Sequence, residues 1–235
     1  DKGSKTFRNE IFKDYKANRG ETPEDLIPQF QLIKDATKVF NIAMVEEEGY
    51  EADDIIASYA KVSAKNDFEV KIVSSDKDLM QLVEPGISML DPMKNKIINE
   101  KEVFEKFGVA PNKVIDVQSL AGDSSDNVPG VPGIGIKTAA ELINKFGDLD
   151  SLLESAEQIK QPKRREKLIE FAGDAILSRK LVTLKNDIKI KIPLDKLKYV
   201  PPEYTKVIEF LKEMEFTSLV NRLTKKSDNN KFNND

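Results

Sequence analysis

The chain has 235 residues, of which 39% are hydrophobic and 33% are charged, enough for one or two domains with a real core. It contains no cysteine and no histidine, which excludes disulfides, thiolate or histidine-ligated metal sites, and every mechanism that needs a histidine base. The net charge of −4 argues weakly against nucleic acid, although the distribution of charge matters more than its sum.

No apolar run approaches the roughly 18 residues that a membrane span needs, and there is no secretory signal pattern. We therefore expect no membrane partner, and the absence of cysteine fits the reducing cytoplasm.

The first part of the chain is predicted to alternate between strands and helices. Residues 5–19 are basic and interleaved with aromatic side chains. Thr22 and Pro23 are typical of a helix start, and apolar residues at helical spacing up to Phe40 predict a helix that buries one face. A short strand is predicted over 42–46.

Residues 50–66 predict a helix, 69–73 a buried strand, 86–92 another strand, and 99–108 a helix that ends at Gly108. This alternation predicts a parallel sheet. From about residue 110 the pattern is helical, so an α/β part should precede an all-α part. The polar tail over 225–235 predicts a disordered linker.

Three acidic clusters lie at the ends of predicted elements. Each has an ordinary explanation by itself, since acids in a first helical turn complement the dipole and Asp-rich segments form turns and caps. Together, in a chain without histidine, clustered carboxylates suit Mg²⁺ or Mn²⁺. The candidate ligands are Asp1, Glu51, Asp53, Asp54, Asp76, Asp78, Asp123 and Asp126. Without these eight charges the net charge of −4 would be +4, which indicates an acidic pit in a mildly basic scaffold.

Such a pit suits two metal ions about 3.5–4 Å apart, one activating water and the other stabilising the leaving oxygen. Lys16 and Arg19 are candidate cations for the charge that develops on a phosphate. A solvated helix face is the competing interpretation of these two residues.

The segment "GVPGIGIKTAAELINKFG" over 130–147 predicts a helix–turn–helix hairpin with Gly133 and Gly135 in the turn. It has neither the Walker spacing nor the preceding strand of a dinucleotide site. Backbone N–H groups in such a turn can approach a phosphate, and Lys137 and Thr138 can reach the same phosphate. A tight hairpin that needs glycine only for its dihedral angles is the alternative.

Four segments, "TFRNEIFKDYKANR", "GYEADDIIAS", "SSDKDLMQLV" and "AGDSSDNVPGVPGIGIKTAAELINKFG", in this order and spacing, resemble the 5′–3′ exonuclease domain of bacterial DNA polymerase I, a member of the flap endonuclease superfamily. The resemblance extends to about Leu223. It implies a PIN-like α/β parallel-sheet domain over 1–109, an all-α region with a helix-three-turn-helix over 110–223, and a linker over 224–235.

The resemblance also implies roles for the candidate residues. Glu51, Asp53, Asp54 and Asp76 would line a first metal site, and Asp78, Asp123 and Asp126 a second. Asp1 is similar to the acid at the end of an early strand. Lys16 and Arg19 would lie on a basic helical arch that grips the scissile phosphate and the 5′ flap. The hairpin at Gly133, Gly135, Lys137 and Thr138 would bind duplex and hold a K⁺ ion.

The implied function is hydrolysis of phosphodiesters near a 5′ end or flap of DNA, or in an RNA–DNA primer hybrid, during replication and repair. The implied protein is a cytoplasmic monomer fused to a polymerase module. Family members carry a first strand and helices before the position of Asp1, with another metal-binding aspartate. We therefore expect a fragment that is poorly active or unstable alone.

Three alternatives remain open at this point. One is a standalone flap nuclease without a polymerase. Another is a non-catalytic module that binds duplex DNA, in which the acids only cap helices and binding ignores Mg²⁺. A small-molecule phosphatase of PIN-like shape leaves the hairpin unexplained.

Overall fold

The computed structural model describes residues 2–231, with the backbone alone at Ser4 and over 225–231. The chain divides into two compact units, one built from residues 1–19 and 46–191 and the other from 20–45 and 192–235. No helix in the described part of the chain is both long and apolar enough to cross a membrane.

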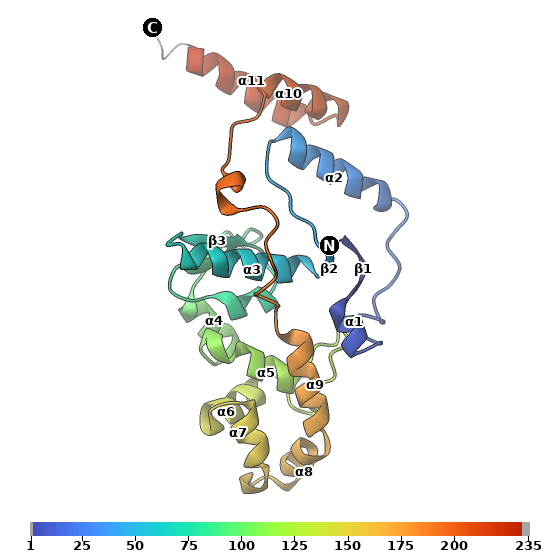
Figure 1. The fold of residues 1–235 in the computed structure, drawn as a ribbon, viewed down its shortest axis with the longest axis vertical. Coiled ribbons are helices and arrows are strands. Elements are labelled where there is room, and N and C mark those ends of the chain that lie inside the picture. The colour runs from blue at the N-terminus through green and yellow to red at the C-terminus, as the bar shows by residue number, and fades with distance from the viewer. Residues whose placement is uncertain (1, 232–235) are drawn as a thin grey trace. The chain divides into compact units, whose positions relative to one another are not determined.

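The first unit begins with an α/β part that contains two small sheets (Figure 1). Its elements in chain order are β1 (Lys2–Thr6), α1 (Phe7–Ile11), β2 (Glu48–Gly49), α3 (Ala52–Lys65), β3 (Val70–Val73), the 3₁₀ helix η1 (Asp78–Leu82), β4 (Ile87–Asp91), β5 (Lys96–Ile98) and α4 (Glu100–Phe107). Strand β1 pairs with β2 in parallel, β3 pairs with β4 in parallel, and β5 pairs with β4 antiparallel. The predicted parallel sheet is confirmed, and β5 was not predicted.

Strand β4 shows that one face of its sheet packs on the core while the other face is partly exposed. Its side chains alternate, so that Ile87 and Met89 enter the core while the residues between them are half-exposed. The strand predicted over 69–73 is present as β3, but the prediction that it is buried is wrong, because Ile72 is buried while Val73 is 61% exposed. In the described sheet β3 is an edge strand, and α3 packs against it on one face.

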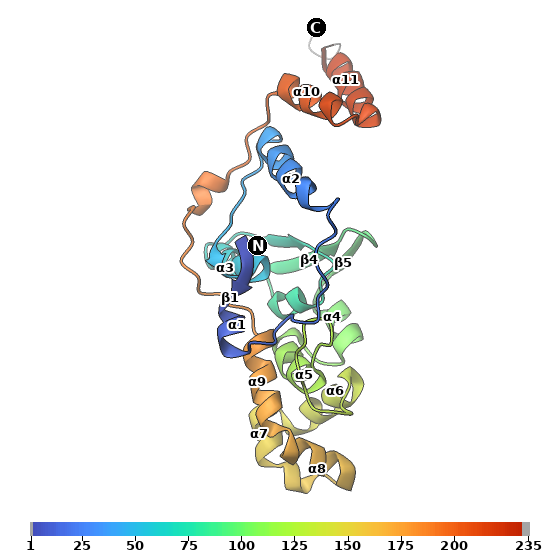
Figure 2. The same ribbon diagram turned by 90° about the vertical axis from the view of Figure 1, so that its right-hand side faces the viewer.

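The rest of the first unit is helical, as predicted. It contains η2 (Pro111–Lys113), α5 (Val114–Ala121), α6 (Ile136–Phe146), α7 (Leu149–Glu154), η3 (Ala156–Gln158), α8 (Pro162–Glu170) and α9 (Ala172–Val182). Figures 1 and 2 both show α5 between α9 and α6, and α5 packs against each of them. One hydrophobic core continues from Met89 in β4 through Val117 in α5 to Leu168 in α8. This shared core fixes the helical part against the sheet.

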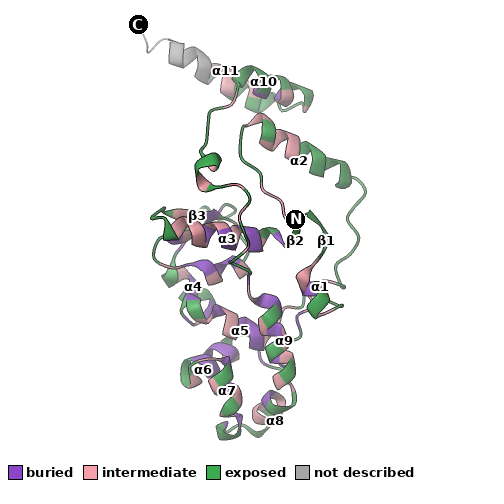
Figure 3. Cartoon of the chain, in the orientation of Figure 1, coloured by how far each residue is buried: buried purple, intermediate pink, exposed green. Residues whose placement is uncertain are grey.

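The second unit contains α2 (Ile27–Val39), η4 (Leu194–Leu197), α10 (Tyr204–Glu213) and α11 (Thr217–Lys231), with α2 packed against α10. A helix follows Pro23, but it begins at Ile27 with Leu26 as its N-cap, so the start predicted at Thr22 and Pro23 is wrong. The prediction that this helix buries one face is also wrong. Phe30 and Ile33 are 48% and 59% exposed, and α2 has no buried residue (Figure 3). Within its unit, α10 is the helix that packs against α2.

Two further predictions about chain segments are wrong. Residues 42–46 form no strand, because no strand in the described part of the chain pairs with this segment, and Ile42 is 55% exposed. Helix α11 continues to Lys231, into the segment predicted to be disordered. Residues 232–235 of that segment lie outside the described residues.

Candidate active site

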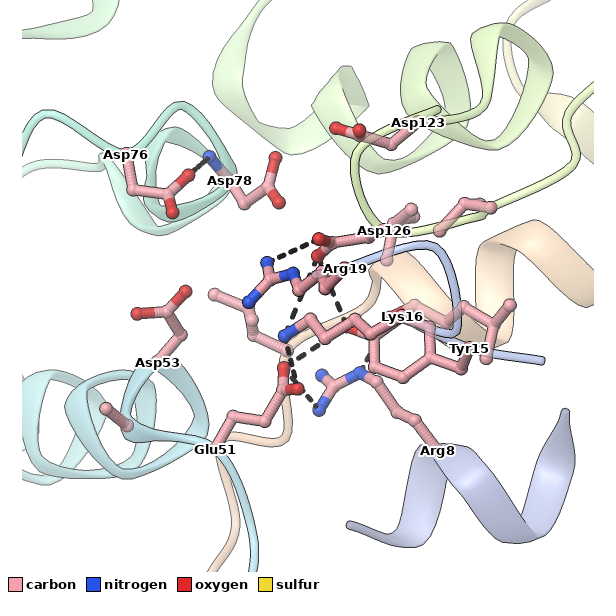
Figure 4. A pocket seen from close by; sticks show the side chains of 15 residues that line it. Arg8, Tyr15, Lys16, Arg19, Glu51, Asp53, Asp76, Asp78, Asp123 and Asp126 are labelled. Carbon is pink, nitrogen blue, oxygen red and sulfur yellow. Dashed lines mark hydrogen bonds and ion pairs between the residues drawn. The ribbon is translucent and has the colours of Figure 1, made fainter. Parts of the chain in front are cut away.

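A cavity of about 240 Å³ collects side chains from all three predicted acidic clusters (Figure 4). The carboxylates that line it are Glu51, Asp53, Asp76, Asp78, Asp123 and Asp126. Three cations, Arg8, Lys16 and Arg19, line the same cavity. Asp1 lies outside the described residues. The structure thus brings together six of the eight carboxylates that the sequence singles out, and both candidate cations.

The first two clusters are placed by the ends of neighbouring elements. Glu51 is the N-cap of α3, and Asp53 follows in its first turn. Asp76 lies in the loop after β3, where its Oδ1 accepts a hydrogen bond from the backbone N–H of Asp78 at 2.9 Å. In Figure 4, Asp53 faces the cavity on the side opposite Asp76 and Asp78. The carboxyl end of β3 and the N-terminus of α3 therefore share one site, as open α/β folds favour.

The third cluster lies in the connection between α5 and α6. Asp123 and Val128 exchange two backbone hydrogen bonds, of 3.0 and 2.7 Å, which close a tight loop around Asp126. Gly122 and Gly130 cross within this connection with positive φ angles of 68° and 61°. A Cβ added to Gly122 would meet the carbonyl oxygen of Val128 at 2.6 Å, so only glycine fits there. These two glycines, rather than those singled out from the sequence, set the position of the acidic loop.

The segment that carries Lys16 docks onto this loop. The backbone N–H of Lys16 donates to the carbonyl of Asp126 at 2.9 Å, and Asn127 Nδ2 donates to the carbonyl of Asp14 at 2.7 Å. Residues 13–18 form turns instead of the helical arch that the resemblance implied. Lys16 has a φ of 60°, a left-handed conformation that interrupts a right-handed helix.

Cations pair with three of the six carboxylates that line this cavity, Glu51, Asp123 and Asp126. Lys16 Nζ contacts Glu51 and lies 3.7 Å from Asp126, which also pairs with Arg19. Lys77 pairs with Asp123. Burial would raise the pKa of Asp123, but hydrogen bonds from Lys77 and Ser125 lower it below its usual value.

Two other carboxylates, Asp53 and Asp78, are partly buried beside neighbouring carboxylates. Burial and the neighbouring Asp76 raise the pKa of Asp53 to about 6, and the same two causes raise that of Asp78 to about 6. Both side chains hold their protons more tightly than an isolated aspartate, which marks the cavity as a place where an added cation would relieve repulsion.

Asp54 stands apart from the other candidates. It is fully buried and does not line the cavity. Arg8 Nη1 and Nη2 each donate to it at 2.7 Å, and the backbone N–H groups of Lys185 and Glu51 donate at 2.9 and 3.1 Å. Four hydrogen bonds occupy both of its oxygens. Its position is that of a structural counter-ion for Arg8.

Arg8 was not singled out from the sequence, although it is among the most buried residues of the chain. Its guanidinium also donates to the carbonyls of Leu181 at 2.7 Å and Thr183 at 3.0 Å, at the end of α9. Arg8 therefore ties α1, α3 and α9 together beneath the cavity. Tyr15 and Lys77 were missed as well. Lys77 had a visible signal, because it stands between two candidate carboxylates in "DKD".

The donor set fits a hard divalent cation, since the acidic side chains here offer only oxygen. Within the described residues, no three acidic side chains are already arranged to hold a metal ion. The cations compete for the same oxygens, so Glu51 would have to leave Lys16, and Asp123 would have to leave Lys77, before either could bind metal.

The hairpin residues lie outside this cavity. Gly133 has a φ of 84° in the turn, Gly135 is the N-cap of α6, and Lys137 and Thr138 lie in the first turn of that helix. Lys137 is exposed and Thr138 is half-buried. The structure thus separates a carboxylate-rich cavity from a glycine-capped helix start on the same unit.

Comparison with known proteins identifies two family models that match adjacent parts of the chain. The first, described as the N-terminal resolvase-like domain of 5′-3′ exonucleases, matches residues 1–108. The second, described as the C-terminal SAM fold of 5′-3′ exonucleases, matches residues 109–205.

Two relatives illustrate the similarity in sequence. DNA polymerase I of Rhizobium leguminosarum is 53% identical over 228 residues, which are 97% of this chain and 22% of that protein. A 5′-3′ exonuclease of Aquifex aeolicus is 38% identical over 225 residues, which are 96% of this chain and 76% of that protein. The chain thus spans about a quarter or less of the DNA polymerase I relatives that it matches, between 22% and 26%.

Solved structures support the fold. T5 5′-exonuclease with bound zinc superposes with a TM-score of 0.71 at 24% identity, covering 90% of this chain and 81% of that one. The catalytic core of Rad2 in complex with DNA substrate gives a TM-score of 0.57 at 17% identity, covering 90% of this chain and 70% of that one. At these identities the likeness establishes the architecture of a parallel-sheet domain followed by a helical one.

Proposed function

Since this chain belongs to the 5′-3′ exonuclease family, we propose that it is a metal-dependent nuclease that hydrolyses phosphodiesters near a 5′ end or flap. The single observation that carries the proposal is the cavity where six carboxylates from three segments meet Lys16 and Arg19. Carboxylates alone would repel a phosphate, and cations alone would bind one without cutting it. Their combination suits metal-assisted cleavage.

The proposed metal sites follow the arrangement of the carboxylates. Glu51, Asp53 and Asp76 would hold one divalent ion, and Asp78, Asp123 and Asp126 a second, with Asp1 added by resemblance. Asp54 would support the first site through Arg8 instead of binding metal. Bound Mg²⁺ or Mn²⁺ supplies charge neutralisation and lowers the pKa of a coordinated water. T5 5′-exonuclease with bound zinc supports this proposal.

The chain's own residues would bind and orient the substrate. Lys16 and Arg19 lie next to Glu51 and Asp126, and once metal takes those carboxylates both cations are available to the scissile phosphate. The hairpin at Gly133, Gly135, Lys137 and Thr138 would hold duplex backbone without reading sequence, and a K⁺ ion there is part of the proposal.

We propose that the substrates are DNA with a 5′ end or flap and RNA–DNA primer hybrids, cut by a cytoplasmic monomer. A fused polymerase module is proposed because the DNA polymerase I relatives are about four times as long as this chain. The Aquifex relative, of which the chain covers 76%, favours the alternative of a standalone nuclease.

The test is cleavage of a 5′-labelled flap duplex in Mg²⁺, in Mn²⁺ and in chelator. It is run on this chain and on a version extended by the strand and helices that the resemblance places before Asp1, each with an Asp76→Asn control. Metal-dependent cutting near the junction that Asp76→Asn stops is the expected result. Duplex binding that ignores metal, without cutting by either protein, would replace the nuclease with a non-catalytic binding module.

A further inference from the structure

Gln118 lies behind one of the carboxylates of the acidic cavity, in the interior of the protein. It lies on α5, is 4% exposed and is not among the residues that line the cavity. Its Nε2 donates a hydrogen bond to Oδ1 of Asp78, a lining carboxylate that comes from a different part of the chain. No motif or spacing in the sequence singles out this glutamine.

The oxygen of the Gln118 amide, Oε1, is buried and accepts no hydrogen bond from any described residue. The Asp78 carboxylate requires the N–H end of the amide, because turning the amide over would bring oxygen against oxygen. A buried acceptor without a partner costs stability. Gln118 therefore donates a hydrogen bond to Asp78 while its own oxygen stays unpaired, which lowers the stability of the fold.

Gln81 shows how a glutamine that serves only the fold is arranged in the same unit. Its Nε2 donates to the carbonyl of Val182 at 3.0 Å, and its Oε1 accepts from the backbone N–H of Leu184 at 3.0 Å. Both ends of that amide stabilise the backbone. Gln118 differs in having one end unpaired and the other on a candidate metal ligand.

Asp78 lines the cavity together with Asp76 and Asp123, two further carboxylates. The amide N–H of Gln118 behind Asp78 fixes the direction of this carboxylate without forming an ion pair with it, unlike the ammonium of Lys77, which pairs with Asp123.

We propose that Gln118 is a positioning residue, which holds the Asp78 carboxylate in place for a divalent cation in the cavity. The inference rests on the proposed function, since it gives Asp78 the role of a metal ligand. The positioning role depends on the hydrogen bond from Gln118 to Asp78. Gln118→Asn, whose side chain is one methylene too short to reach Asp78, should therefore behave like the apolar variant Gln118→Met.

The test compares Gln118→Met with the matched variant Gln81→Met. Mn²⁺ binding is measured by titration calorimetry, stability by urea unfolding in chelator, and activity by flap cleavage over a range of Mn²⁺ concentrations. In Gln118→Met, the Kd for Mn²⁺ should rise about 10-fold, as expected for one lost hydrogen bond to a charged group. Its midpoint in urea should stay the same or rise, because no buried oxygen is left unpaired. Gln81→Met should unfold more easily and keep its Mn²⁺ affinity.

The inference is overturned if Gln118→Met unfolds as easily as Gln81→Met while its Mn²⁺ affinity is unchanged, since Gln118 would then serve only the fold. If the unsubstituted chain binds Mn²⁺ and Gln118→Met binds it weakly, but no flap is cut even by the version extended before Asp1, the positioning role stands and the nuclease proposal fails. If the unsubstituted chain and Gln118→Met cut equally at limiting Mn²⁺, the nuclease proposal stands and the positioning role fails. If the unsubstituted chain binds no Mn²⁺, the nuclease proposal and the positioning role are both overturned.

Discussion

Replacing Asp54 by asparagine should destabilise the fold by about 3–5 kcal/mol, the usual cost of breaking a buried ion pair. Asp54 is 0% exposed and its partner Arg8 is 1% exposed. The change removes the carboxylate that Arg8 contacts at 2.7 Å and leaves the buried guanidinium with Glu51, which lies 3.4 Å from Nη1 and also pairs with Lys16. The adjacent change Asp53→Asn should behave in the opposite way.

The magnitude follows from the four hydrogen bonds that Asp54 accepts. An asparagine can keep its oxygen toward Arg8 Nη2 and the backbone N–H of Lys185. Its amide nitrogen then faces Arg8 Nη1 and the N–H of Glu51, which are both donors. One charge-assisted hydrogen bond, worth about 1.5–3 kcal/mol, is lost, and one buried N–H is left unpaired at about 1–3 kcal/mol.

The assay is urea unfolding at pH 7, in chelator and in Mn²⁺, for Asp54→Asn and Asp53→Asn. In chelator, Asp53→Asn should be as stable as the unsubstituted chain or more so, because it removes repulsion from Asp76 and Glu51. It should lose most of the stabilisation by Mn²⁺, whereas folded Asp54→Asn should retain it. The double variant Arg8→Met/Asp54→Leu should be less destabilised than the sum of its single changes, and it keeps the test open if Asp54→Asn does not fold.

A structural role for Asp54 is refuted if the free energy of unfolding of Asp54→Asn in chelator lies within about 1 kcal/mol of that of the unsubstituted chain, and Mn²⁺ no longer stabilises the variant. Asp54 would then be a metal ligand, as the resemblance implied, and its pairing with Arg8 would matter little to the fold.

Three other outcomes are expected. In chelator, Asp53 and Asp78 bind protons more tightly in the folded chain, with a pKa of about 6, than in the unfolded chain, where the pKa is 3.8. The stability that they contribute is therefore full below about pH 4 and is lost as pH rises to about 6, by up to about 3 kcal/mol for each group. Urea unfolding of the double asparagine variant should lack this decline, and an identical pH profile would contradict the assignment. Gly122→Ala should cost about 2–4 kcal/mol, because its Cβ would lie 2.6 Å from the Val128 oxygen at a left-handed φ; a loss as small as that of Gly20→Ala, which has open space, would show that the loop can shift. Lys16→Met should slow cleavage about 100-fold or more while Mn²⁺ still binds, and a loss of Mn²⁺ binding instead would mean that Lys16 positions carboxylates.

The sequence was sufficient for the class of fold and for the chemistry of the site. Periodicity located the helix over 52–65, the strand at 87–91 and the stop at Gly108, because these elements follow from local pattern and capping. The absence of histidine and cysteine, with acids at three element ends, indicated oxygen ligands and a hard metal. These inferences depend on residue types and short spacings, which a sequence displays directly.

Only the tertiary structure decided which acids share the cavity and which one does not. Asp53 and Asp54 are neighbours in the sequence, but successive residues of a helix are about 100° apart around its axis, so that Asp53 lines the cavity and Asp54 binds Arg8. The contact of Gln118 with Asp78 spans 40 positions, and that of Lys16 with the Asp126 loop spans still more. No local pattern encodes such contacts, because they arise from the packing of α5 against η1 and of the first turns against the acidic loop. Residue types therefore set which chemical groups are available, and the packing of distant segments brings some of them into contact.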